Sequence, residues 1–162
     1  MKIFPEKDYS IELNQNSTLA ISELQNQTLS EEQYVVNWNN QSFIGKVKKN
    51  EFQLKLSKKI LGEFCVLNGK LENKKGILKI RTSKRLKIIF TIYILFIIFG
   101  IITAIIQNDL KVVFGLILNM LFMRYILLEL GFRIASKSGI KKLSEIIGIN
   151  KRTEKITLHN TV

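Results

Sequence analysis

The sequence predicts an α+β N-terminal domain, consisting of a short helix and an antiparallel β-meander, followed by a two-helix transmembrane hairpin and a short amphipathic C-terminal helix. Three observations lead to this prediction. Short segments between residues 34 and 81 alternate apolar and polar side chains, residues 88–130 are mostly apolar, and basic residues flank this apolar stretch on both sides. Alternation with a period of two is typical of half-buried strands, whereas a long apolar run is typical of a membrane helix.

The N-terminal domain is expected to cover residues 1–82. "YSIEL" (9–13) alternates as a short strand, and Asn16 or Ser17 is suited to cap a helix that runs to about Asn26. The segments "YVVNW", "SFIGKV", "FQLKLS", "EFCVLNGKLE" and "ILKIR" then predict strands joined by polar or glycine-containing turns. The residues expected to fill one modest core are Trp38, Phe43, Val47, Phe52, Leu54, Leu56, Phe64, Val66, Leu71, Leu78 and Ile80.

The transmembrane hairpin is expected to cover residues 86–130. Residues 88–106 contain no charged side chain and reach the length of about 20 residues that a spanning helix needs. A buried helix of a soluble protein is the alternative for such a run, and its unbroken length disfavours that alternative. The polar turn "QNDLK" (107–111) leads into a second span over 112–130, which reaches spanning length only by including Arg124 and Glu129.

Arg124 raises the question of what accompanies a permanent charge inside a span. Antiparallel pairing across the turn places it level with Tyr93, which is the candidate partner within the chain, and a neighbouring subunit is the alternative source of a partner. Glu129 is five residues away and off its face of an α-helix. Three roles stay open: fixing a hairpin or oligomer seam, lining a conduction or gating path, or lying at the interface in a tilted span. Helix packing is expected to involve Gly100, Ala104 and Gly115, with Asn119 as a polar contact.

Charge is spread unevenly along the chain, which carries a formal net charge of +12. Positive-inside reasoning places both termini in the cytoplasm and the turn outside, so we expect a multi-pass protein of a bacterial inner membrane. The single cysteine, Cys65, fits a reducing compartment. The first residues, "MKIFPEKDYSIEL", contain no apolar h-region, so we expect no secretory signal there. The basic residues expected to contact anionic lipid headgroups are Lys84, Arg85, Lys87, Arg133, Lys141 and Lys142.

The segments "FIGKV", "NEFQL" and "GKLENKKGILKI" are followed at once by basic residues and an apolar hairpin. In this respect residues 42–106 resemble a group of small uncharacterised bacterial membrane proteins, in which a cytoplasmic β-meander ends in a strand that feeds a membrane helix. The resemblance implies this domain order. It implies no activity, cofactor or site residue.

Residues 131–162 are expected to form a basic cytoplasmic tail with an amphipathic helix over about 139–148 that faces the bilayer or the β domain. A helix-turn-helix is the alternative, with "INKR" as its turn and a recognition helix from Thr153 onward. The short distance from Thr153 to residue 162 disfavours this alternative, so nucleic acid is not the expected partner.

The sequence contains no pattern that indicates an enzyme. It has one His and one Cys, no glycine-rich phosphate loop, and no paired carboxylates with acid-base spacing, so no catalytic residue, metal or cofactor is expected. The leading hypothesis is a membrane protein whose cytoplasmic domain is a protein-binding or ligand-sensing module, with a partner protein or a homo-oligomer. The alternatives are a membrane-disrupting defence or toxin effector that oligomerises through the hairpin, and a membrane-tethered DNA-binding protein.

Overall fold

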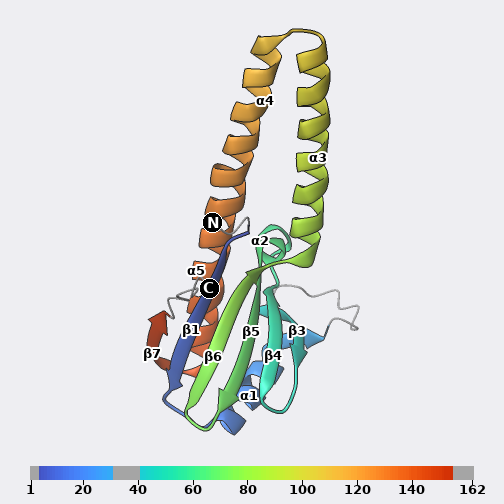
Figure 1. Cartoon of the computed structure of the whole chain (residues 1–162). Helices are drawn as coiled ribbons and strands as arrows, with labels where there is room; N and C mark the ends of the chain where they lie inside the picture. The colour runs from blue at the N-terminus through green and yellow to red at the C-terminus, as the bar shows by residue number, and fades with distance from the viewer. Residues whose placement is uncertain (1–3, 31–40, 155–162) are drawn as a thin grey trace, which may run out of the picture.

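The computed structural model describes residues 4–30 and 41–154, and shows an α+β protein with a mixed seven-stranded sheet and two long helices that project from it (Figure 1). The strands are β1 (Glu6–Leu13), β2 (Thr28–Ser30), β3 (Phe43–Val47), β4 (Glu51–Leu56), β5 (Cys65–Glu72), β6 (Lys75–Thr82) and β7 (Ile149–Glu154). The helices are α1 (Ser17–Asn26), α2 (Lys59–Phe64), α3 (Lys84–Ile106), α4 (Leu110–Phe122), the π-helix η1 (Met123–Leu130) and α5 (Gly131–Ile147).

The sheet has the strand order β2-β3-β4-β5-β6-β1-β7. Strands β3 to β6 form an antiparallel meander between consecutive neighbours, as the alternating segments predict. Strand β1 pairs antiparallel with both β6 and β7, whereas β2 runs parallel to β3. The expected strand at 34–38, with Trp38, lies outside the described residues.

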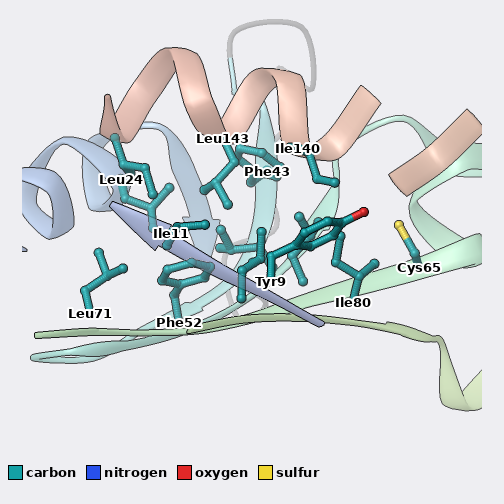
Figure 2. Packing of buried hydrophobic residues seen from close by; sticks show 14 of the residues in the cluster. Tyr9, Ile11, Leu24, Phe43, Phe52, Cys65, Leu71, Ile80, Ile140 and Leu143 are labelled. Atoms are coloured by element: carbon teal, nitrogen blue, oxygen red, sulfur yellow. The ribbon is translucent and has the colours of Figure 1, made fainter. Parts of the chain in front are cut away.

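The hydrophobic core lies between one face of the sheet and the helices α1 and α5. Figure 2 shows Ile140 and Leu143 of α5 above Phe43 and Phe52 of the strands, with Leu24 of α1 beside them. Most of the predicted core residues lie in this cluster or pack against it. Val66 is buried as predicted, at 8% exposed, but it lies outside this cluster, because the pleat of β5 turns it toward the opposite face of the sheet from Cys65 and Leu67.

The segment after the second apolar run differs from the prediction of a tail with a separate helix over 139–148. Residues 110–147 form one continuous helical stretch, and its last part, α5, buries Phe132, Leu143 and Ile147 in the core of the sheet domain. Gly148 then ends the helix in the left-handed conformation, with φ of 66°. The physical reason for this difference is tertiary packing, because the apolar face of α5 is buried against the sheet.

The turn of the alternative helix-turn-helix is not found, because the residues assigned to it belong to a strand. Ile149–Glu154 form β7, which pairs with β1 through contacts such as Ser10 with Thr153. The remainder of the expected recognition helix lies outside the described residues. Strand β7 therefore forms one edge of the sheet, next to the N-terminal strand β1.

Gly131 allows α2 to pack closely against the long helical stretch. A Cβ atom at this position would lie 2.1 Å from a ring carbon of Phe64. Replacing Gly131 by alanine is therefore expected to lower the free energy of unfolding by about 1 kcal/mol, because the clash outweighs the better helix propensity of alanine. The matched control is Gly115→Ala, where a Cβ meets nothing within 4 Å. Equal thermal midpoints for the two variants in detergent would contradict this packing.

Candidate functional site

The first functional feature is the apolar surface of the long helices. Two helical stretches, Lys84–Ile106 and Leu110–Ile147, are long and apolar enough to cross a membrane, and only 17% and 6% of their apolar windows are buried. Within the described residues, every exposed large hydrophobic side chain except Leu19 and Ile77 lies on α3, α4, η1 or α5. A core helix of a soluble protein would instead be largely covered by its own chain.

The polar residues of the helix pair contact one another near the middle of α3. The hydroxyl of Tyr93 donates a hydrogen bond to the side-chain oxygen of Asn119. Arg124 follows Asn119 by five residues, nearer the sheet domain, and its Nη1 lies 3.5 Å from Oε2 of Glu129. Tyr93 thus has Asn119 as a hydrogen-bond partner, and Arg124 has Glu129 as an ion-pair partner. The contact between Arg124 and Tyr93 stays a prediction.

The pairing of Arg124 with Glu129 depends on the π-helix η1. In an α-helix residues five apart point about 140° away from each other. A π-helix has hydrogen bonds from i to i+5 and a wider turn, which brings such residues to the same side. Glu129 also accepts a hydrogen bond from Nε of Arg133 at 3.1 Å, so one carboxylate is shared by two guanidinium groups. The expectation that Glu129 is off-face assumes α-helical geometry and therefore does not hold here.

The small residues of the helix pair lie in different environments. A Cβ on Gly100 would lie 3.2 Å from a methyl carbon of Leu116, so Gly100 is at the contact between α3 and α4. Ala104 is buried. Gly115 lies on the exposed side of α4, where an added Cβ meets no atom of this chain.

The basic residues gather at the end of the helix pair that joins the sheet domain. Nη1 of Arg85 lies 3.4 Å from Oε1 of Glu63, and Nζ of Lys87 lies 5.5 Å from the ring centroid of Phe4. We call the exposed apolar surface of the helix pair between Ile88 and Leu130 the apolar belt. Lys84 is exposed in the first turn of α3, close to this belt. Lys141 and Lys142 begin ten residues after Gly131, about 15 Å along the helix and therefore farther from the belt.

Helix α3 joins the sheet domain without a flexible linker. The last residue of β6, Thr82, is followed by the helix cap Ser83 and then by α3 itself. The buried Ser83 hydroxyl accepts a hydrogen bond from the backbone N–H of Leu86 at 3.2 Å and donates one to the carbonyl of Glu63 at 2.5 Å. These contacts fix the direction in which α3 leaves the sheet.

The second candidate feature is the face of the sheet opposite α1 and α5, on which none of the described helices packs. We call it the uncovered face, and Figure 1 views it with α5 behind the strands. A shallow hollow lies over β3, β4, β5 and β6 on this face. In register across these strands, Lys46 pairs with Gln53, Gln53 with Asn68, and Asn68 with Lys79. We call these four residues the donor row. Alternation in the sequence indicates which residues share a face of one strand, but the row itself depends on strand register.

Cys65 is a buried thiol at the edge of the core. Burial raises its pKa from 9.0 to about 12. We expect iodoacetamide at pH 9 to leave it unmodified in the folded protein and to modify it rapidly after denaturation. Between pH 9 and 12 the unfolded chain loses the thiol proton that the folded chain keeps, so stability falls as pH rises through this range. Rapid modification of the folded protein would contradict this.

The fold and its exposed surfaces define an α+β protein with two helices suited to a membrane. Comparisons with models of protein families, with curated proteins and with solved structures find no match to this chain.

Proposed function

We propose that this chain is a small integral inner-membrane protein whose sheet domain is a non-enzymatic binding module at the cytoplasmic surface. The observation that carries the proposal is the exposed apolar surface of the helix pair. Burying one large apolar side chain contributes about 1.5–3 kcal/mol, so a surface with this many is far more stable in lipid than in water. The intrahelical hydrogen bonds of α3 and α4 also meet the requirement that a membrane places on the backbone.

The charges support an orientation with the sheet domain inside the cell. Lys84, Arg85 and Lys87 flank the apolar belt at the sheet end of α3, and Arg133 flanks it on the other helix. The turn at the far end has Asp109 and Lys111, whose charges cancel. Positive-inside asymmetry then favours the sheet domain and both ends of the chain in the cytoplasm.

The sheet domain supports a binding role through its uncovered face. The donor row presents two ammonium groups and two amides to solvent. Such groups bind anions without taking part in a chemical reaction. The direct junction at Ser83 keeps this face at a fixed distance from the helix pair.

Membrane integration is tested by alkaline carbonate extraction of cells that express the full chain. The wild-type protein is expected in the membrane pellet, released only by detergent. A Phe96→Lys/Phe99→Lys variant is expected to lose this retention, because both side chains are highly exposed on α3, at 72% and 67%. Leu19→Lys on α1, which is 58% exposed, is the control and should remain in the pellet. Carbonate release of the wild type would contradict the proposal.

A further inference from the structure

The uncovered sheet face divides into two halves with different charge balance. On the side of β1, Arg81 is held by two carboxylates: its Nη1 lies 2.6 Å from Asp8, and its Nε lies 3.1 Å from Glu6. One guanidinium therefore already has two carboxylate partners here. On the side of β3 to β6, no ion pair is formed by Lys46, Lys48 or Lys79 within residues 4–30 and 41–154.

The hollow on the second half contains more positive than negative charge. Its lining includes Lys46, Lys48, Lys70 and Lys79 against Glu51 as the single acid. Nζ of Lys70 is 3.0 Å from Glu72, so this lysine has a partner already. Ile77, 41% exposed, adds an apolar contact at the edge of the donor row. The surface is complementary to a ligand that has carboxylates and some apolar surface.

The donor row is longer than a small anion. Neighbouring strands lie about 4.8 Å apart, so Lys46 on β3 and Lys79 on β6 are separated by three such spacings, about 14 Å. A ligand that contacts both ends must therefore carry several anionic groups along its length. The hollow is also open to solvent, which differs from the enclosed pockets that bind small molecules.

Lipid headgroups are too far away to be this ligand. Lys79 lies three strand residues before Thr82, and the apolar belt begins at Ile88 of α3, which together give about 17 Å along the two elements. The headgroup layer beside the hydrocarbon is only about 5–8 Å thick. Single-stranded nucleic acid is disfavoured because it needs aromatic platforms, and the hollow presents no exposed ring among its lining residues.

We propose that the donor row Lys46–Gln53–Asn68–Lys79 is the docking surface for an acidic segment of a partner protein. The lysines at the two ends bind carboxylates, the amides between them bind carbonyl or carboxylate oxygens, and Ile77 contacts an apolar side chain of the segment. This inference rests on the proposed function, since it names the partner class of the cytoplasmic module.

The test measures binding of a fluorescent acidic peptide, rich in glutamate with interspersed leucine, to the full chain in lipid nanodiscs by anisotropy. Lys46→Gln/Lys79→Gln is expected to weaken binding by about tenfold. Lys137→Gln/Lys141→Gln, with the same charge change on α5 at the covered side of the sheet, is expected to bind as wild type. Elevated salt should weaken wild-type binding, because the contact is electrostatic.

Three results would overturn the docking surface: no binding of the peptide, equal losses in the two double variants, or tighter binding of a single-stranded oligonucleotide that depends on Lys46 and Lys79. If any of these results is obtained while the protein remains in the carbonate-resistant pellet, the docking proposal is wrong and membrane integration still holds. Release of the wild type by carbonate would instead contradict the proposed function, independently of the peptide-binding result.

Discussion

Replacing Phe132 by alanine is expected to lower the free energy of unfolding of the sheet domain by about 3–5 kcal/mol, the usual cost of removing a buried phenylalanine side chain. Phe132 is 1% exposed and belongs to the core cluster between α5 and the sheet. The physical reason is that α5 covers the sheet, so Phe132, which follows the second apolar stretch, is part of the folded domain. Thermal unfolding of the purified protein in detergent measures the loss.

The control for Phe132 is two residues away on the same helix. Ile134 is 57% exposed, so Ile134→Ala removes a similar apolar group without leaving a cavity in the core. Its thermal midpoint should stay close to that of the wild type. If Phe132→Ala unfolds at the same temperature as Ile134→Ala, the segment after residue 130 is not integral to the sheet domain.

Replacing Glu129 by glutamine is expected to destabilise the helix pair by about 2 kcal/mol, because Arg124 loses a counter-ion while it stays within the apolar segment. Replacing both residues, as Arg124→Leu/Glu129→Leu, should recover most of the stability, since an ion pair in an apolar setting contributes little over a hydrophobic pair. The double-mutant cycle is measured by thermal loss of helical circular dichroism in detergent.

Two further variants separate this ion pair from general charge effects. Glu145→Gln makes the same charge change at an exposed site of α5 and should leave stability unchanged. Arg124→Leu alone should cost less than Glu129→Gln, because Glu129 keeps its contact with Arg133. A Glu129→Gln variant as stable as Glu145→Gln would show that the π-helical contact has no energetic role.

Local patterns in the sequence predict much of the sheet domain. Helix α1 ends at Asn26 as expected, and the alternating segments from residue 43 to 81 become β3 to β6. These elements are determined by nearby residues: apolar side chains at a period of two, and turns such as Asn73–Lys74 between strands. The apolar runs likewise correspond to the two helices suited to a membrane.

Features that depend on distant partners could not be predicted in the same way. Strand β7 forms because β1 offers an edge, although Ile149–Glu154 has only one apolar residue. The π-helix pairs Arg124 with Glu129 at a spacing that rules for α-helices exclude. The donor row combines four strands whose register is fixed by the core on the other face of the sheet.

The proposed function requires that the helix pair crosses the membrane with the sheet domain on the cytoplasmic side. Single cysteines at two exposed turns test it directly: Gln107→Cys after α3 and Lys74→Cys between β5 and β6. Buried Cys65 should give little background. With a membrane-impermeant maleimide on spheroplasts, we predict labelling of Gln107→Cys in intact membranes and of Lys74→Cys only after lysis. Labelling of Lys74→Cys without lysis, or protection of Gln107→Cys, would contradict this orientation.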